Sequence, residues 1–302
     1  MYDIIVIGGG MAGMTACLYA LRNGKKTLLI EGSSIGGQIA QSPKVENYPT
    51  KKQVSGEGLS QELFDQISDL GVEFEFDNID SIQKIDNIFR LTGEFGVYEG
   101  YSVIIANGVK HRKLNLPNED KLVGHGIYYC ALCDGPFFKG REVTLIGDGN
   151  TALQYALLLS DIASKVNLVI MFDKFFGDQA LVDLVENKSN IQIIRNSKTV
   201  ELKGDQELES IVFERSDKTR FEISGTPLFV AIGQIPDNKR FENLAGLDKF
   251  GYFDSDESTK TKTAGLFVAG DTRKKEVRQV TTAMCDGAIA ATQACNYLFS
   301  VK

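Results

Sequence analysis

The sequence predicts an α/β protein made of two doubly wound nucleotide-binding-type domains, the second inserted into the first. Two strand–glycine turn–helix units predict this fold, one at the start of the chain and one after residue 142. A return to the pattern of the first domain near the end of the chain predicts the insertion. The length of 302 residues agrees with two domains, at about 150 residues each. We predict that residues 1–113 and 243–302 form the outer domain and that residues 114–242 form the inserted domain.

The first half of the chain reads as alternating strands and helices joined by short turns. Short β-branched or apolar runs predict strands over residues 4–7, 27–30, 72–76, 89–91 and 101–106. Helical patterns cover residues 14–23, where Gly24 is the expected C-terminal cap, and residues 59–70. The polar stretch 111–121, which contains a proline, is predicted to link the domains.

The pattern then starts again. We expect strands over residues 142–146, 166–172 and 191–194, and a helix over residues 152–162 that follows a glycine turn at 147–152. A second linker-like segment covers residues 235–243. A strand over residues 266–269 and a long Ala-rich helix over residues 281–298 then complete the outer domain.

The composition excludes several classes of protein. The chain carries 33 Lys and Arg against 40 Asp and Glu, a net charge of −7, which counts against nucleic acid or a membrane surface as partner. No apolar run approaches the ~20 residues of a membrane span, and the start lacks the basic segment of a secretory signal. We therefore expect a cytoplasmic protein.

The glycine turn at the start of the chain predicts a dinucleotide site. Gly8 permits the tight turn, Gly10 lets the backbone approach a pyrophosphate, and Gly13 lets helix and strand pack closely. Glu31 ends the next strand, where its carboxylate can bind ribose hydroxyls and would repel a 2′-phosphate. The ligand is therefore FAD or NAD, and the expected contacts of the turn are Gly8, Gly10, Met11, Ala12 and Gly13.

A second strand end narrows this choice. Asp271 follows the strand 266–269 and Gly270, where its carboxylate can bind the ribityl and phosphate region that FAD has and NAD lacks. A simple turn-capping aspartate is the alternative. Together with the glycine turn, Asp271 favours FAD.

Two of the five cysteines, Cys130 and Cys133, form a C-x-x-C pair. Zinc needs four ligands, and the sequence offers no second such pair and only two histidines, His111 and His125, so we expect no metal. A redox pair explains the adjacent Asp134, which can protonate a leaving thiolate, better than two unreactive buried thiols do. The other cysteines, Cys17, Cys285 and Cys295, are expected to be packed as small apolar residues.

Five motifs resemble those of the low-molecular-weight thioredoxin reductases, in the same order and over nearly the whole chain. They are Gly36-Gly37-Gln38, Val45-Glu46-Asn47-Tyr48-Pro49, Cys130-Ala131-Leu132-Cys133-Asp134-Gly135, Gly270-Asp271 and Arg278-Gln279-Val280-Thr281-Thr282-Ala283. The resemblance implies that Gln38, Asn47, Asp271, Arg278 and Gln279 contact FAD. It also implies that Cys130 attacks the disulfide of thioredoxin, that Cys133 faces the flavin, and that the protein is a homodimer.

The inserted domain departs from this family at one segment. Relatives that use NADPH carry a basic H-R-R-x-x-x-R segment, whose arginines bind the 2′-phosphate. The corresponding positions here are apolar: Ile170, Met171, Phe172 and Phe176. Asp148 also places a carboxylate in the second glycine turn, and no acidic residue stands where NADH would need one. We therefore predict that this domain has lost its nucleotide and only carries the cysteine pair.

Intact flavin motifs without the basic segment are similar to the ferredoxin-dependent flavin thioredoxin reductases. The leading hypothesis is an FAD enzyme that takes single electrons from reduced ferredoxin and delivers electron pairs to thioredoxin through Cys130 and Cys133. Because ferredoxins are acidic, a basic docking face is expected, either residues 110–113 or, preferably, residues 273–275 with Arg278. The alternatives are a thioredoxin reductase using NADH or NADPH through an altered pocket, a reductase of another C-x-x-C protein, and a non-catalytic redox sensor.

Overall fold

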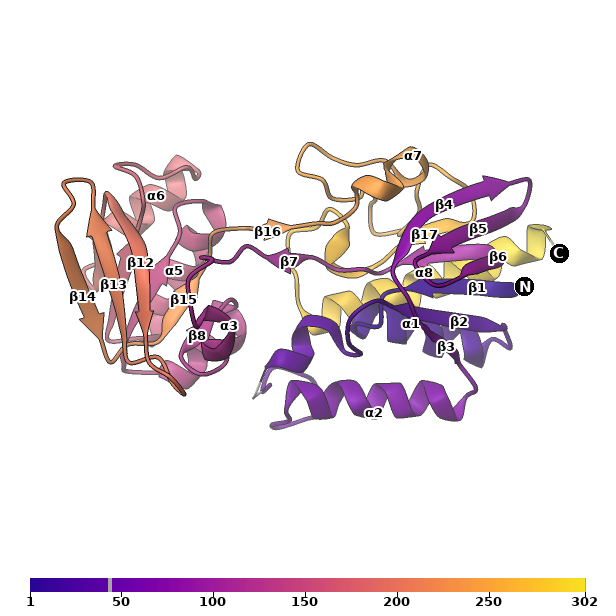
Figure 1. The fold of residues 1–302 in the computed structure, drawn as a ribbon, viewed down its shortest axis with the longest axis horizontal. Coiled ribbons are helices and arrows are strands. Elements are labelled where there is room, and N and C mark those ends of the chain that lie inside the picture. Colours follow the sequence, from indigo (N-terminus) through magenta and orange to yellow (C-terminus); the bar gives the residue numbers. More distant parts are fainter. Residues whose placement is uncertain (43–44, 302) are drawn as a thin grey trace. The chain divides into compact units, whose positions relative to one another are not determined.

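A computed structural model describes residues 1–42 and 45–301. The chain divides into two compact units: an outer unit, Met1–Lys110 with Ile235–Lys302, and an inserted unit, His111–Gln234 (Figure 1). Two short strands, β7 (Lys110–His111) and β16 (Gln234–Ile235), pair with each other where the chain passes between the units. Each unit is built on its own sheet and has its own core.

The outer unit contains a seven-stranded sheet with the order β3-β2-β1-β6-β5-β4, in which β17 also pairs with β6. Strands β1, β2, β3, β6 and β17 pair in parallel, whereas β4, β5 and β6 form an antiparallel meander. The strands are β1 (Tyr2–Ile7), β2 (Thr27–Glu31), β3 (Glu73–Phe76), β4 (Ile79–Ile85), β5 (Ile88–Gly93), β6 (Val97–Ile105) and β17 (Leu266–Val268).

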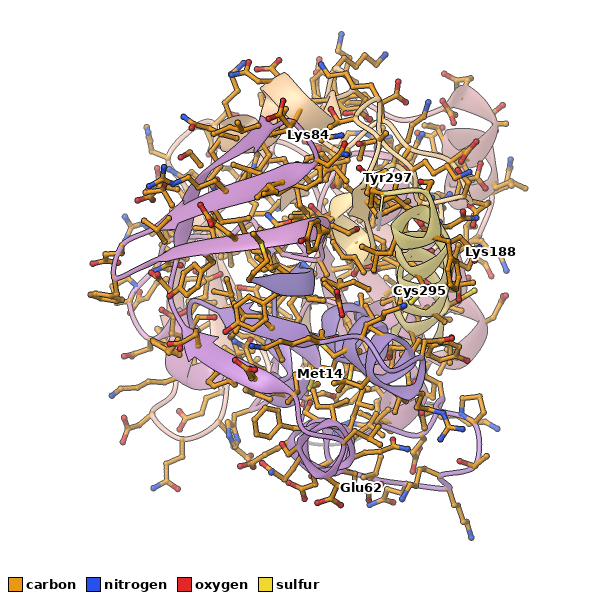
Figure 2. All side chains as sticks on the ribbon, turned by 90° about the vertical axis from the view of Figure 1, so that its right-hand side faces the viewer. Met14, Glu62, Lys84, Lys188, Cys295 and Tyr297 are labelled. Carbon is orange, nitrogen blue, oxygen red and sulfur yellow. A yellow bond between two sulfur atoms is a disulfide. The ribbon has the colours of Figure 1, made fainter. Side chains whose placement is uncertain are left out.

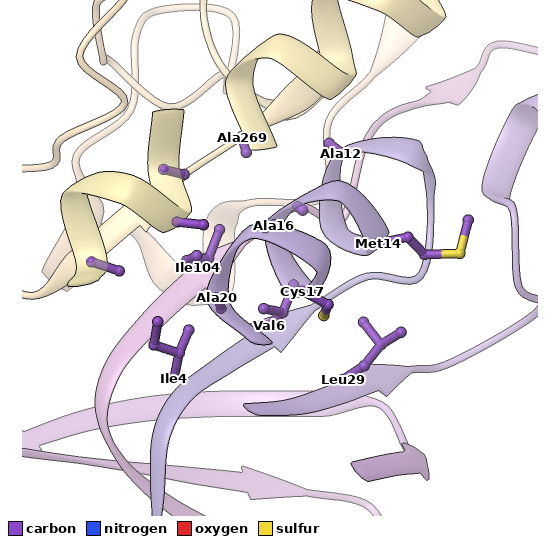
Figure 3. Packing of buried hydrophobic residues seen from close by; sticks show 14 of the residues in the cluster. Ile4, Val6, Ala12, Met14, Ala16, Cys17, Ala20, Leu29, Ile104 and Ala269 are labelled. Carbon is purple, nitrogen blue, oxygen red and sulfur yellow. The ribbon is translucent and has the colours of Figure 1, made fainter. Parts of the chain in front are cut away.

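Three helices of the outer unit, α1 (Met11–Arg22), α2 (Gly56–Asp69) and α8 (Val280–Val301), contribute to one core cluster with one face of this sheet. Figure 3 shows the part of this cluster that α1 forms with strands of the sheet. Because side chains alternate along a strand, Ile4 and Val6 of β1 enter this cluster, whereas Ile5 and Ile7 enter the core on the other face. Small residues let α1 and α8 approach closely. The shorter helical segments are η1 (Gly37–Gln41), η3 (Lys239–Phe241), α7 (Glu242–Ala245) and η4 (Gly270–Thr272).

The free cysteines differ in their surroundings. Cys17 and Cys295 are buried, as predicted, and Cys295 lies with Met14 in the core cluster that α1 and α8 share (Figure 2). The prediction is wrong for Cys285, which is exposed on α8. That helix packs against the sheet on one side only, so an Ala-rich sequence does not bury every residue along it.

The inserted unit has a five-stranded parallel sheet with the order β11-β10-β9-β15-β8. Helix α5 packs on one face, and an antiparallel sheet of three strands contributes apolar residues to the core on the other. The elements are α3 (Glu119–Leu122), β8 (Ile127–Tyr128), α4 (Ala131–Asp134), η2 (Gly135–Phe138), β9 (Glu142–Ile146), α5 (Asn150–Ile162), β10 (Lys165–Val169), α6 (Gln179–Glu186), β11 (Ile191–Ile194), β12 (Ser197–Lys203), β13 (Ser210–Arg215), β14 (Arg220–Ser224) and β15 (Leu228–Val230).

The predicted fold class is confirmed, with two local differences. The three-stranded layer β12-β13-β14 was not predicted. The strand predicted over residues 166–172 ends at Val169, because Ile170 is fully buried at its end and Met171 and Phe172 turn outward into an exposed loop. No helix in the described ranges is long and apolar enough to cross a bilayer.

The passages between the units come earlier in the chain than the predicted boundaries. Residues 235–242 belong to the outer unit, because the buried amide of Asn238 donates to the carbonyls of Gly251 and Thr272, both at 3.0 Å, and because Phe241 is buried. The stretch 111–121 is likewise folded rather than a linker. Glu119 is buried there and its carboxylate accepts hydrogen bonds from the backbone of Leu114 and from the hydroxyl of Tyr129, both at 2.8 Å.

Candidate active site

The first glycine turn leaves an open approach to the backbone at the start of α1. Gly8 has a φ of +108°, and a Cβ at Gly13 would lie 1.9 Å from the carbonyl oxygen of Gly8, so both positions require glycine. A Cβ at Gly10 would meet only the carbonyl oxygen of Gly36, at 3.9 Å. Met11 and Ala12 begin the helix and are buried. Among the described residues no side chain caps α1, so its first N–H groups are available to an anion.

Glu31 lies at the end of β2, beside this turn. Its buried carboxylate accepts hydrogen bonds from the backbone N–H of Gly9 at 2.5 Å and from the N–H and Oγ of Ser33 at 2.7 and 2.9 Å. The glycine turn therefore holds the carboxylate in place at the strand end.

Asp271 follows β17 in the short helical turn η4. Its Oδ1 atom is buried and has no hydrogen-bond partner in the part of the chain that the structure describes. Burial raises the pKa of this carboxyl to about 6, against the opposing effect of the cations Lys275 and Arg278. A buried polar atom without a partner is rare, and a bound polar ligand would satisfy it.

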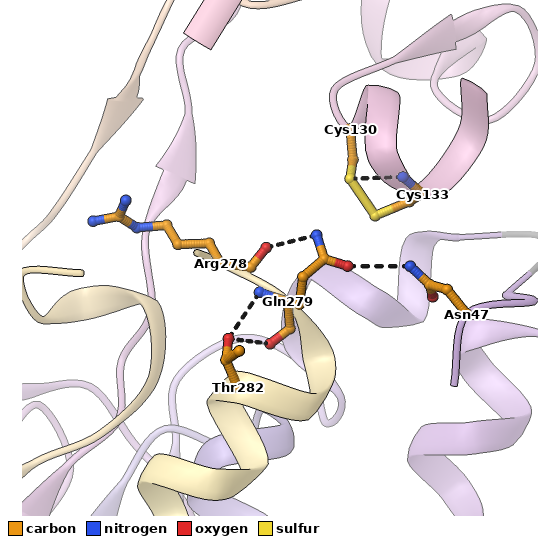
Figure 4. Close-up of a disulfide and its surroundings, with 6 residues drawn as sticks. All are labelled: Asn47, Cys130, Cys133, Arg278, Gln279 and Thr282. Carbon is orange, nitrogen blue, oxygen red and sulfur yellow. Dashed lines mark hydrogen bonds between the residues drawn. A yellow bond between two sulfur atoms is a disulfide. The ribbon is translucent and has the colours of Figure 1, made fainter. Parts of the chain in front are cut away.

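Arg278, Gln279 and Asn47 form a network at the start of α8 (Figure 4). The Asn47 amide donates to Oε1 of Gln279 at 3.1 Å, and the Gln279 amide donates to the carbonyl of Arg278 at 2.8 Å. The Arg278 guanidinium donates to the carbonyls of Lys275 and Asp271 and stacks on Tyr252 at 4.4 Å. Gln38, at the N-terminal side of the same unit, donates its amide to the carbonyl of Val109.

The basic segment 273–278 is not a free cationic surface, and this corrects the docking face preferred from the sequence. Arg273 and Lys275 are 2% and 6% exposed and both bind the buried carboxylate of Asp286. Of the three cations at 273–275, Lys274 alone is well exposed, at 66%. Asp286 is also a residue that the sequence analysis missed, although a carboxylate in an otherwise apolar helix signals a buried partner.

Cys130 and Cys133 form a disulfide across the start of α4 (Figure 4). The backbone N–H of Cys133 donates to Sγ of Cys130 at 3.1 Å. Asp134 is 8% exposed, and burial raises the pKa of its carboxyl from 3.8 to about 7. The carboxyl can therefore hold or release a proton near neutral pH, and it belongs to the residue that directly follows a cysteine pair whose sulfur atoms need a proton during thiol–disulfide exchange.

The second glycine turn is closed by the chain itself. The N–H of Phe176 donates to the carbonyl of Asp148 at 2.8 Å, and Asn150 and Asp178 are joined by two hydrogen bonds at 2.7 and 2.9 Å. A carboxylate therefore lies at the start of α5, where a nucleotide phosphate would need positive potential.

The four apolar positions beside this turn lie in two different environments. Met171, Phe172 and Phe176 are 49%, 46% and 59% exposed, and the two phenyl rings pack edge to face at 5.2 Å. Ile170 is fully buried, so a side chain at that position does not reach the surface in this structure. Three of the four positions thus form an exposed apolar surface.

Comparison with known proteins agrees with this arrangement. The family model described as pyridine nucleotide-disulphide oxidoreductase matches residues 2–287. The chain is 38% identical over 306 residues to a thioredoxin reductase of Peptoclostridium acidaminophilum, covering 99% of this chain and 97% of the relative. It is 36% identical over 298 residues to the 34.2 kDa protein in rubredoxin operon of Clostridium pasteurianum, covering 98% and 97% of the two chains. The chain belongs to the low-molecular-weight thioredoxin reductase family.

A solved structure agrees as well. The crystal structure of thioredoxin reductase from Streptococcus pyogenes superposes with a TM-score of 0.95 at 32% identity, and 99% of each chain is covered. Members of the thioredoxin reductase family are FAD-binding flavoproteins, and this chain is one of them. Two features of the outer unit fit FAD: the unsatisfied buried Oδ1 of Asp271 and the open backbone at Gly10.

Proposed function

We propose that this flavoprotein reduces the disulfide of thioredoxin through FAD and the Cys130–Cys133 pair, with reduced ferredoxin as the electron donor. The observation that carries the choice of donor is the exposed apolar surface of Met171, Phe172 and Phe176, where a cationic site would be needed for the 2′-phosphate of NADPH. A phosphate dianion placed there would meet three apolar side chains where the segment of relatives that use NADPH carries cations, with Lys174, whose Nζ lies 5.8 Å from the centre of the Phe176 ring, as a neighbouring cation. When bound, FAD supplies the conversion between single electrons and electron pairs.

The reduced cysteine pair carries out the exchange with thioredoxin. The Cys130 thiolate attacks one sulfur of the thioredoxin disulfide, forms a mixed disulfide and displaces the other sulfur as a thiolate, to which Asp134 gives its proton. The Cys133 thiolate then attacks Sγ of Cys130, re-forms the internal disulfide and releases the second thioredoxin thiolate. In the disulfide the Cys133 N–H donates to Sγ of Cys130 at 3.1 Å, and a donor kept there after reduction would stabilise a thiolate on Cys130.

The proposed FAD site lies in the outer unit. It consists of Gly8, Gly10, Met11, Ala12, Gly13, Glu31, Gln38, Asn47, Asp271, Arg278 and Gln279. The residues of the first glycine turn would donate backbone N–H groups to the pyrophosphate of FAD. The carboxylate of Glu31 would accept hydrogen bonds from the ribose hydroxyls, and the carboxylate of Asp271 would accept hydrogen bonds from the ribityl and phosphate region.

The donor face needs positive charge, since ferredoxins are acidic. Because Arg273 and Lys275 are buried against Asp286, we propose the other cluster as the docking face, where Arg112 and Lys113 of the inserted unit are exposed, the latter paired with the exposed Asp120 at 2.5 Å. One of the relatives is named for its place in a rubredoxin operon.

The donor is tested by mixing the oxidised protein anaerobically with NADPH, NADH or reduced ferredoxin and following the flavin absorbance. We expect rapid bleaching with reduced ferredoxin and none with either nucleotide at concentrations that saturate other nucleotide-dependent reductases. Adding oxidised thioredoxin to the bleached protein should restore the absorbance. Rapid bleaching by NADPH or NADH would contradict the assignment of ferredoxin.

A nucleotide-dependent thioredoxin reductase is the second candidate. An open hollow of about 670 Å³ lies beside β11 and the end of β13, lined in part by Asp173, Arg195 and Arg215. The two arginines could bind a phosphate there, outside the segment that carries the cations in relatives that use NADPH. The same titration separates the two candidates.

We also propose that the protein is a homodimer, by analogy with the family. Light scattering of the purified holoenzyme should then give twice the mass of one chain of 33.2 kDa. A mass of one chain at micromolar concentration would contradict the dimer.

A further inference from the structure

One buried carboxylate holds together a loop that the proposed FAD site depends on. Asp286, on α8, is 2% exposed and accepts four hydrogen bonds. They come from the N–H of Gly270 at 3.0 Å, from Nε and Nη2 of Arg273 at 2.8 Å each, and from Nζ of Lys275 at 2.9 Å. All three donor residues lie in the segment that immediately surrounds Asp271.

The same turn of α8 is fixed against the first glycine turn. A Cβ at Gly287, the next residue, would lie 2.1 Å from the carbonyl oxygen of Ala12, so α8 and α1 touch there through their backbones. Gly270 has a φ of +80°, and a Cβ on it would lie 2.9 Å from Cβ of Ala12. One helical turn thus contacts both halves of the proposed site, the start of α1 through Gly287 and the Asp271 loop through Asp286.

The charge of Asp286 matters as much as its position. The charged and titratable groups that interact with the Asp271 carboxyl are Lys275, Arg278, Asp286 and Tyr252. Arg273 and Lys275 are buried cations, and a buried cation without a counterion costs several kcal/mol. If Asp286 were neutral, Arg273 would keep the exposed Glu257 as a partner, whereas Lys275, which already interacts with the Asp271 carboxyl, would draw that side chain into an ion pair instead of leaving it unpartnered.

We propose that Asp286 is a positioning residue for FAD: it orders the Gly270–Asp271 turn and keeps the Asp271 carboxylate free for the cofactor. This inference rests on the proposed contact between Asp271 and FAD. A contribution to folding stability does not by itself explain why Asp286, Arg273 and Lys275 are buried together. Replacing a buried ion pair with apolar residues of similar volume often leaves stability unchanged or increases it.

The test compares the purified holoenzyme with four variants and measures FAD release by the increase in flavin fluorescence. Asp286→Asn removes the charge. The double variant Arg273→Met/Asp286→Leu removes the Arg273–Asp286 pair and leaves Lys275 as the one cation of this pair of donors without Asp286, so it is expected to disturb the fold less than the single variant, which leaves both cations unpaired. Glu257→Gln is the matched control, because Glu257 binds the same Arg273 at 2.9 Å but is 83% exposed. Asp271→Asn reports on the cofactor contact itself.

We expect Asp286→Asn and the double variant to release FAD about tenfold faster or more, the size expected when a hydrogen bond to a charged group is lost. The visible absorption band of the bound flavin should shift in the same variants, while Glu257→Gln keeps both the release rate and the spectrum of the unchanged protein. Circular dichroism of each holoenzyme separates these effects from a loss of fold.

Two outcomes would overturn the inference and have different meanings. If the double variant folds and keeps FAD with the original rate and spectrum, whereas Asp271→Asn loses it, Asp286 has no positioning role. If Asp271→Asn also keeps the original rate of FAD release and the original flavin spectrum, the proposed contact between Asp271 and FAD is wrong. The proposed role of Asp286 is then wrong as well.

Discussion

Replacing Cys133 with serine is expected to trap a covalent complex between this protein and thioredoxin, whereas Cys130→Ser forms none. Cys133→Ser keeps the Cys130 thiol and the backbone N–H of residue 133 that donates to its sulfur, so the attacking thiolate is still favoured. The variant lacks the thiol that would resolve the mixed disulfide. Both variants should lose thioredoxin turnover by about 10⁴-fold or more, because residues that act as one catalytic unit fail together.

The complex is detected by mass spectrometry and by its loss on adding dithiothreitol. Cys285→Ser is the control, since Cys285 is an exposed thiol on α8 outside the proposed site, and this variant should keep full turnover. A stable mixed disulfide formed by Cys130→Ser, and not by Cys133→Ser, would reverse the roles assigned to the two cysteines.

The sequence predicted those parts of the fold and site that depend only on residues close together in the chain. A glycine at position 8 or 13 is required by the conformation and contacts of one short turn, and the pattern of three glycines between a strand and a helix is visible in the sequence. The C-x-x-C spacing likewise fixes the disulfide, because a single turn brings residues 130 and 133 together. These features needed no knowledge of distant residues.

The layer β12-β13-β14 was missed because the pattern of its first strand is weak. In β12 the buried residues are Ser197, Thr199 and Leu202, so the alternation holds only as far as the bulge after Thr199, and two of these three buried side chains are polar. Its hydrophobic periodicity is therefore weak. The role of this sheet as the second layer of the inserted unit depends on contacts with β15 and β9 residues far along the chain.

The docking face was misjudged for a similar reason. Arg273, Lys274 and Lys275 read as a basic surface cluster when only neighbours in the sequence are considered. Their charge is decided by Asp286, which is brought to them by the packing of α8 against the core of the outer unit. The residues next to a cation in the sequence do not show whether a different helix or strand supplies its counterion.

Replacing Asp134 with asparagine is expected to slow thioredoxin reduction about 100-fold at neutral pH, the lower end of what a general acid contributes. Asparagine keeps the shape of the side chain but cannot give up a proton. The exchange rate of the unchanged protein should fall as the pH rises through about 7, where Asp134 loses its proton. In Asp134→Asn this decline should be absent, which stopped-flow measurements of the exchange step between pH 5.5 and 8.5 would show.

Although Asp134→Asn is expected to slow the reaction, it is expected to make the folded protein more stable at pH 8. Because burial raises the pKa of Asp134 from 3.8 to about 7, the folded protein binds this proton more tightly than the unfolded chain does. Its contribution to stability is therefore present below pH 4 and is lost as the pH rises through 7, by up to about 4 kcal/mol. Asp134→Asn should remove this loss, so that at pH 8 the variant unfolds at higher denaturant concentration while it turns over more slowly. A variant less stable than the unchanged protein at pH 8 would mean that the carboxylate has a partner that compensates its burial, and the assignment of Asp134 as the proton donor would then be wrong.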